Sequence, residues 1–314
     1  MTNHVLVTGG AGYLGSVLCE HLLNAGYQVT VIDNLMYGQH SLFHLCNNPR
    51  FEFVFGDVRD EELMRRLMRE VDVLIPLAAI VGAPACDRDP WLAESVNCSA
   101  IELLNRLRSP AQMVIYPSTN SGYGTKTNNI PCTEETPLEP ISLYGITKVR
   151  AEKLLINSQN VVSLRLATLF GVSPRMRLDL LVNNFTYRAV RDRFLVLYEA
   201  HFKRSYLHVK DAARAFCHCI EHFVDMQGEA YNVGLEEANL SKLELAEKIK
   251  EHVPELYIHC EEVGTDPDRR NYITSYAKIR GHGFETRHSL DEGIEQLLKA
   301  FRMIQLTGWG NAQV

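Results

Sequence analysis

Tyr144 and Lys148 form the pair of side chains whose types and spacing most directly suggest chemistry. Residues four apart on a helix lie on the same face. A cation beside a phenol favours the phenolate, so such a tyrosine can accept the proton of a sugar hydroxyl as a hydride leaves its carbon. Lys148 is also placed to hold the ribose of a nicotinamide. The alternative is an ordinary Tyr and Lys on the surface of an amphipathic helix.

A run of hydroxyl side chains favours the catalytic interpretation. The segment 117–124, Pro-Ser-Thr-Asn-Ser-Gly-Tyr-Gly, stands at the end of a predicted strand. In an open parallel sheet, ligands bind at the carboxyl ends of the strands. A hydroxyl at that edge and a tyrosine on the next helix converge, and the hydroxyl can polarise the same sugar oxygen.

Three glycines, Gly9, Gly12 and Gly15, lie between the first predicted strand and the first predicted helix. Their spacing allows a tight turn, close approach of the main chain to a pyrophosphate, and packing of the helix on the sheet. The alternative is a glycine-rich turn without a ligand, but strand, loop and helix fall where a dinucleotide site needs them. The expected cofactor contacts in this loop are Gly9, Gly12, Tyr13 and Leu14.

Two carboxylates follow the next predicted strands. Asp33, followed by Asn34, can accept hydrogen bonds from adenosine ribose hydroxyls and would repel a 2′-phosphate, which predicts NAD rather than NADP. The alternative is that Asp33 merely begins a turn with Asn34. Asp57 and Val58 follow the third strand, where Asp57 can either reach the adenine edge or cap the following helix.

Strand and helix patterns alternate through the first half of the chain. Strands separated by helices require crossovers, which predicts an α/β fold with a Rossmann doubly wound parallel sheet. We expect an NAD-binding domain over 1–170, to which the chain returns at about 205–235, and a smaller mixed α/β substrate-binding domain over 171–204 and 236–314. The predicted strands are 4–8, 28–33, 50–55, 71–79, 112–118, 161–166 and 230–233, and the predicted helices are 12–25, 61–69, 91–107, 144–156, 211–223 and 241–252.

Composition and charge argue against several classes of function. The net charge is -6 without a long basic run, so we expect no nucleic-acid partner. No apolar run approaches the ~18 residues of a membrane span and no signal peptide precedes the first strand, so we expect no membrane association. The eight scattered cysteines fit a reducing cytoplasm. The triplet 217–219, Cys-His-Cys, does not suit a metal site, because residues i and i+2 on a helix point apart.

Together, these motifs resemble the extended short-chain dehydrogenase/reductases that act on nucleotide sugars, of the epimerase/dehydratase type. The resemblance covers nearly the whole chain, and the order and spacing of the motifs carry it. In chain order they are T-G-G-x-G-x-x-G from 8, V-I-D-N-L to 35, G-D-V at 56–58, L-A-A at 77–79, the segment 117–124, Y-x-x-x-K at 144–148 and R-S-Y-L-H-V-K-D at 204–211.

The resemblance implies a role for each matching residue. Tyr144 is the expected acid/base, Lys148 its partner and Thr119 the second hydroxyl, while Leu77, Ala78 and Ala79 join the NAD contacts. A bidentate guanidinium suits a diphosphate, and the resemblance places Arg204 there, with Arg269 or Arg270 beside it. The expected substrate contacts are Thr119, Asn120, Asn184, Arg204 and Arg270. The implied partner is a nucleotide-diphosphate sugar linked to GDP, UDP or dTDP.

Departures from the family pattern narrow the reaction. The family's sugar 4,6-dehydratases carry an acid and a base after the catalytic Thr, where this chain has Asn120 and Ser121, so 4,6-dehydration is disfavoured. Pro76 replaces the His of many relatives, without an evident meaning. Oxidation at C4 remains. The segments 117–124 and 170–185 look most like the GDP-heptose C4 dehydrogenases of capsule biosynthesis, and a 4-epimerase is the alternative that the residues leave open.

Two further expectations concern class and assembly. An NAD-binding sensor or scaffold without catalysis is the alternative of another class, although the tyrosine, lysine and hydroxyl are all present. The predicted helices 91–107 and 144–156 correspond to those that pair as a four-helix bundle in family dimers, so we expect a homodimer. The same helices could equally be ordinary helices that cover the sheet.

Overall fold

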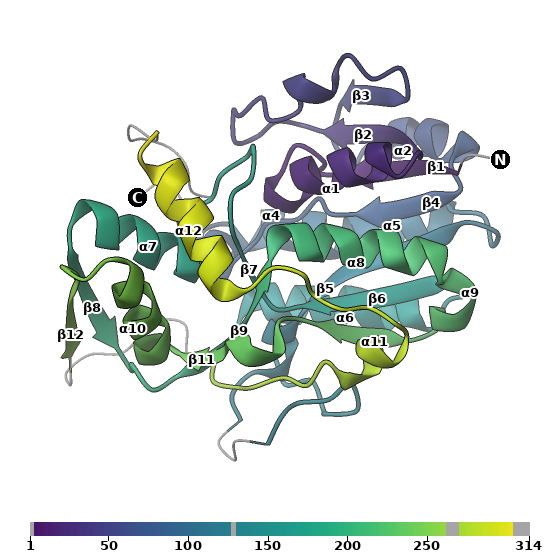
Figure 1. Ribbon diagram of the computed structural model, residues 1–314. Coiled ribbons are helices and arrows are strands. Elements are labelled where there is room, and N and C mark those ends of the chain that lie inside the picture. The colour runs from purple at the N-terminus through teal and green to yellow at the C-terminus, as the bar shows by residue number, and fades with distance from the viewer. Residues whose placement is uncertain (1–2, 127–129, 262–269, 304–314) are drawn as a thin grey trace.

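A seven-stranded sheet forms the centre of the computed structural model, which describes residues 3–126, 130–261 and 270–303 (Figure 1). The strand order is β10-β6-β5-β4-β1-β2-β3, and each neighbouring pair is parallel. This arrangement confirms the predicted fold class. The strands are β1 (His4–Thr8), β2 (Gln28–Asp33), β3 (Phe51–Phe55), β4 (Val73–Pro76), β5 (Met113–Thr119), β6 (Val161–Leu166) and β10 (Ala230–Val233).

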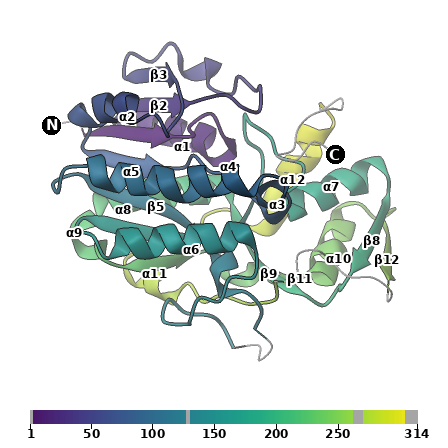
Figure 2. The same cartoon turned by 180° about the vertical axis from the view of Figure 1, so that it is seen from behind.

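Helices cover both faces of the large sheet. On one face, α1 (Tyr13–Asn24) packs along α8 (Val209–Glu221), as Figure 1 shows. Figure 2 shows the opposite face, where α5 and α6 lie side by side. The elements of that face are α2 (Glu61–Leu67), α4 (Pro90–Glu94), η3 (Ser95–Ser99), α5 (Ala100–Leu107) and α6 (Leu143–Ile156). Because both faces are covered, β1, β4 and β6 are almost wholly buried, whereas the edge strand β3 leaves Phe55 70% exposed.

A smaller lobe lies beside the carboxyl ends of the strands (Figure 1). It holds a three-stranded sheet in the order β11-β9-β7 and a two-stranded sheet of β8 and β12. Its elements include β7 (Thr168–Phe170), α7 (Leu181–Arg191), β8 (Phe194–Tyr198), β9 (Lys203–His208), β11 (Asn239–Ser241), α10 (Lys242–His252), β12 (Tyr257–Glu261) and α12 (Leu290–Phe301). Short helices α3 (Ala83–Arg88), α9 (Phe223–Met226) and α11 (Ala277–Gly281) complete the α-helices of the described residues.

Two predicted elements differ from the structure. The strand expected over 71–79 ends at Pro76, and the chain then turns so that 77–79 line a cleft. The helix expected over 91–107 contains a π-helical turn over Ser95–Ser99. That turn buries Asn97, whose side-chain amide accepts a bond from Ile80 N at 2.8 Å and donates to Ile80 O at 3.0 Å. A π-turn of this kind is common near functional sites, and here it fixes the chain that follows β4.

A buried ion pair fastens α6 to the sheet. Arg165 on β6 donates to Glu152 on α6 at 2.7 and 2.9 Å, and Ser163 donates to the other carboxylate oxygen at 3.1 Å. The two charged side chains are 9% and 4% exposed. Removing one partner of a buried pair leaves the other charge unbalanced, so α6 is strongly tied to this position.

We therefore expect Glu152→Gln to lower the free energy of unfolding by about 3–5 kcal/mol, because Arg165 would remain buried without a counter-charge. The control is Glu94→Gln, which removes the exposed pair with Arg150 on the outer face of α6. It should cost less than about 1 kcal/mol, because solvent screens that pair. Urea unfolding of both variants measures the difference, and equal losses would contradict the anchoring role of Glu152.

Candidate active site

A cleft of about 780 Å³ opens at the carboxyl ends of β1, β2, β4 and β5, between the large sheet and the smaller lobe. It gathers almost all of the residues expected from the sequence. Asn120 and Asn184 do not line it. The expected residues that do line it are Gly9, Gly12, Tyr13, Leu14, Asp33, Asn34, Asp57, Val58, Leu77, Ala78, Ala79, Thr119, Tyr144, Lys148, Arg204 and Arg270.

The glycine loop has the shape that a dinucleotide diphosphate requires. Gly9 has a φ of 68°, and a Cβ on it would lie 2.6 Å from Ala78 N, so only glycine fits. Gly12 is the N-cap of α1 and provides no side-chain hydrogen bond to that helix. The first N–H groups of α1 therefore remain available to an anion, as a phosphate-binding helix terminus needs. These residues fit the diphosphate of NAD.

Asp33 shapes the local turn and also lines the cleft. Its carboxylate accepts hydrogen bonds from Ala11 N at 3.0 Å and Leu35 N at 2.8 Å, so it shapes the local turn. It also lines the cleft, beside the end of β2. Burial raises the pKa of Asp33, and the backbone hydrogen bonds act against that rise. The carboxylate is thus held rigidly at the place predicted for the adenosine ribose.

The capping role considered for Asp57 is wrong. Asp60 is the N-cap of α2 and accepts a hydrogen bond from Leu63 N, whereas Asp57 pairs with Arg59 at 2.7 Å. The Arg59 side chain lowers the pKa of Asp57, so this carboxylate is ionised. It lines the cleft, and its contact with adenine stays a prediction.

Tyr144 lies in the first turn of α6, whose N-cap Ser142 accepts a hydrogen bond from Gly145 N at 3.2 Å. The positive end of a helix favours an ionised phenol there. Burial raises the pKa of Tyr144, while the charges of Arg177 and Arg270 and a hydrogen bond with Thr119 act in the opposite direction. Tyr144 and Thr119 thus converge on one point of the cleft, as expected from the sequence.

Lys148 occupies the next turn of α6, deep in the wall of the cleft. It is 4% exposed, and its Nζ lies 4.2 Å from the centroid of the Tyr116 ring. Burial lowers the pKa of Lys148 to about 7, although the Glu152 charge acts against that fall. The guanidinium groups of Arg177 and Arg270 oppose the rise in the Tyr144 pKa, and support of Tyr144 by Lys148 stays a prediction.

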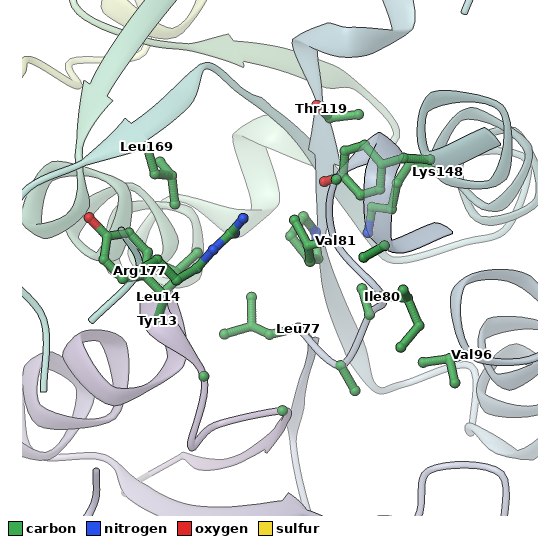
Figure 3. A pocket seen from close by; sticks show the side chains of 18 of the residues that line it. Tyr13, Leu14, Leu77, Ile80, Val81, Val96, Thr119, Lys148, Leu169 and Arg177 are labelled. Carbon is green, nitrogen blue, oxygen red and sulfur yellow. The ribbon is translucent and has the colours of Figure 1, made fainter. Parts of the chain in front are cut away.

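The hydroxyl segment forms a short chain of hydrogen bonds. Thr119 donates to Ser121 Oγ at 3.0 Å and accepts from Ser121 N at 3.1 Å. Arg270 donates to the same Ser121 oxygen. Figure 3 shows Thr119 and Lys148 on one side of the cleft and Arg177 extending from the opposite wall. Hydroxyl and phenol groups therefore line one side of the cleft, and a guanidinium lines the other.

The two expected substrate residues outside the cleft have structural partners. Asn120 is fully buried, and its amide donates to Thr274 Oγ1 at 3.5 Å. The Asn184 amide donates to Leu178 O at 3.0 Å. Its neighbour Asn183 bonds to Tyr13, Gly171 and Arg177. Roles of Asn120 and Asn184 in substrate binding stay predictions, and Arg269 lies outside the described residues.

Several cationic residues of the cleft were not singled out from the sequence. Arg175, Arg177 and Lys242 line it together with Arg204, so seven Lys and Arg side chains face four Asp side chains in a chain of net charge -6. The sequence feature that could have indicated them is the pair of arginines at 175 and 177, two residues apart in the loop after β7. This local positive charge suits ligands with several phosphates. Among the described residues, no cluster of three or more His, Cys, Asp or Glu could hold a metal.

Residues 5–234 match the NAD dependent epimerase/dehydratase family. The chain belongs to this family. It is therefore an NAD-dependent enzyme. A relative from Haloferax volcanii, the low-salt glycan biosynthesis protein Agl12, is 31% identical over 303 residues, which cover 93% of this chain and 96% of that protein.

Two solved structures show the same architecture. The UDP-glucose 4-epimerase of Thermotoga maritima with UDP-glucose is 27% identical, with a TM-score of 0.82 over 96% of this chain and 99% of that one. The UDP-glucose 4-epimerase of Thermus thermophilus, solved as a complex with NAD, is 26% identical, with a TM-score of 0.81 over 95% and 99%. In the described part of the chain, no helix has the length and apolar character of a membrane span.

We expect Lys148→Met to stabilise the cofactor-free protein at pH 7.5 by about 1–3 kcal/mol, because burial of an ionisable lysine opposes folding. The pKa of Lys148 is lowered from 10.5 to about 7, so between these values the unfolded chain binds the extra proton. The free energy of unfolding of the wild type should therefore rise with pH from about 7 to 10.5. The difference in stability between Lys148→Met and the wild type should shrink over the same range. Urea midpoints at pH 7, 8.5 and 10 test this; a variant that is less stable at every pH would refute it.

Replacing Asp33 with Ser should lower the affinity for NAD relative to NADP by about 10- to 100-fold, because a ribose hydrogen bond and the repulsion of a 2′-phosphate are both lost. The dissociation constants of both cofactors measure the ratio. The control is Asp72→Ser, at the other end of the sheet, which should leave the ratio of the two dissociation constants unchanged. An unaltered preference in Asp33→Ser would show that this carboxylate only shapes the turn.

Proposed function

We propose that this enzyme oxidises C4 of a nucleotide-diphosphate sugar. The observation that carries the proposal is the convergence of Tyr144 and Thr119 in the cleft that also holds the dinucleotide loop. Bound NAD supplies a hydride acceptor. Tyr144 takes the proton of the C4 hydroxyl as the C4–H hydride leaves, and Thr119 holds the same oxygen, so a C4 ketone forms. Lys148 is placed to support Tyr144 and the nicotinamide ribose.

The charge of the cleft supports the choice of substrate. Arg204 and Lys242 are buried, at 3% exposed each, and both line the cleft with Arg270. Buried guanidinium groups suit the fixed geometry of a diphosphate. A solved relative was determined with UDP-glucose, which is a ligand of this kind. We propose that these three cations bind the substrate diphosphate; GDP, UDP and dTDP remain the candidate nucleotides.

The fate of the ketone distinguishes the possible reactions. Neither Asn120, buried outside the cleft, nor Ser121, bonded to Thr119 and Arg270, is an acid or base for elimination, which disfavours 4,6-dehydration. We propose release of the ketone, as in a C4 dehydrogenase of the GDP-heptose type in surface-polysaccharide or capsule biosynthesis, because the segment 170–185 resembles those enzymes. The second candidate is a 4-epimerase, which the likeness to two UDP-glucose 4-epimerases favours.

We also propose the setting of the enzyme. The boundary near residue 170 would separate the NAD-binding and substrate-binding parts. Trp91, Ile146 and Leu154 leave apolar surface exposed on α4 and α6, which supports a homodimer through that face. All eight cysteines are free, which fits the cytoplasm.

Incubation with GDP-, UDP- and dTDP-sugars, followed by mass spectrometry and NMR, tests the proposal. A product two mass units lighter that accumulates only with an added oxidant identifies the dehydrogenase. An isobaric product identifies the 4-epimerase. A dehydrated product would reject C4 oxidation as the net function. Absence of turnover by a protein that binds NAD would also reject it, and would favour a sensor. Tyr144→Phe should reduce turnover by at least about 100-fold while NAD binding persists.

A further inference from the structure

The loop that follows β7 is fastened across the first turn of α1. Tyr13 donates its hydroxyl hydrogen bond to Gly171 O at 2.6 Å, and Ser173 donates to Tyr13 O at 2.7 Å. The hydroxyl groups of Ser16 and Ser173 form a hydrogen bond with an oxygen–oxygen distance of 3.0 Å. This loop therefore lies against the helix terminus whose uncapped N–H groups face the cleft. Any side chain that it directs into the cleft is close to the diphosphate site.

Arg175 is one of the side chains that this loop directs into the cleft. It is 2% exposed, it lines the cleft, and its guanidinium carbon lies 4.4 Å from the centroid of the Tyr37 ring. Its Nε and Nη2 atoms are buried without a hydrogen-bond partner among the residues that the structure describes. A buried cation with unpaired donors is costly, so such a group in a folded protein points to a ligand that completes it.

The neighbouring charges show which ligand would fit. Arg177, two residues further on, is balanced by Asp179 at 2.5 and 3.1 Å. Within the described ranges, Arg175 makes no such pair. Both carboxylate oxygens of the nearby Asp33 already accept hydrogen bonds, one from Ala11 N and one from Leu35 N. The guanidinium therefore faces the dinucleotide end of the cleft, and a diphosphate offers the oxygen pairs that its fork matches.

We propose that Arg175 binds the diphosphate of NAD together with the first turn of α1. The cofactor is then held between a helix terminus of the large domain and a guanidinium from the loop after β7. The Tyr37 ring supports the flat face of that guanidinium, which keeps the fork in one orientation. This contact strengthens retention of the cofactor and leaves Arg204, Lys242 and Arg270 for the substrate.

Calorimetric titration of Arg175→Met with NAD, ADP-ribose and adenosine tests this assignment. We expect NAD and ADP-ribose to bind about 10- to 100-fold more weakly, whereas adenosine, which has no phosphate, keeps its affinity. The matched control is Arg191→Met, since Arg191 also lies against a tyrosine ring, that of Tyr187, but outside the cleft. It should leave all three affinities unchanged.

Thermal unfolding provides a second readout that a merely structural arginine would not give. The cofactor-free Arg175→Met variant should be as stable as the wild type or more so, while its gain in Tm on adding NAD is smaller. If that variant does not fold, Arg175→Lys, which keeps the charge and loses the fork, should show intermediate NAD affinity. Unchanged NAD affinity, a loss confined to NADP, or a loss confined to UDP or GDP would each overturn the proposal.

Discussion

Burial of positive charge at the carboxyl edge of the sheet is the constraint on which the rest of this structure depends. Lys148, Arg175 and Arg204 are all nearly inaccessible to solvent, and each charge buried in this way opposes folding. All three side chains line the cleft, so a ligand there could reach these charges. Ligands that bind the folded state alone then stabilise it by mass action.

The structure treats its buried cations in two ways. Arg165 and Arg177 have carboxylate partners, Glu152 and Asp179, so they can fix elements of the fold. Arg175 lines the cleft without such a partner among the described residues. This division follows the geometry of the chain, since Glu152 faces β6 inside the domain, whereas Arg175 comes from a loop that crosses α1. Charges with internal partners provide rigidity to the fold.

The helix that carries Tyr144 is held in place by a buried side chain outside the cleft. Asn97, in the π-helical turn, binds the backbone of Ile80 and also donates to Thr147 on α6 at 3.2 Å. The chain after β4 and the helix that carries Tyr144 are thereby joined through one buried amide. One fold can support different net reactions, so the residues around the cleft, and not the scaffold, decide the outcome.

The sequence by itself determined the fold class, the family and the NAD loop, because these depend on local patterns. Apolar runs separated by helical spacing require a parallel sheet, and the glycines of 9–15 mark a turn that only small residues can make. Tyr144 and Lys148, one helical turn apart, were found for the same reason. Most of the predicted cofactor residues reach the cleft because strand ends meet at one edge.

Only the tertiary structure decided how charge is distributed around those residues. The π-turn at Asn97 depends on a contact with Ile80, and the capping of α2 by Asp60 rather than Asp57 depends on the path of one loop. The arginines at 175 and 177 are two apart in an ordinary run of residues. Yet Arg175 lies over the ring of Tyr37, whereas Arg177 forms an ion pair with Asp179. Burial and through-space charge set the acidity of a phenol or an ammonium group, and neither can be read from spacing along the chain.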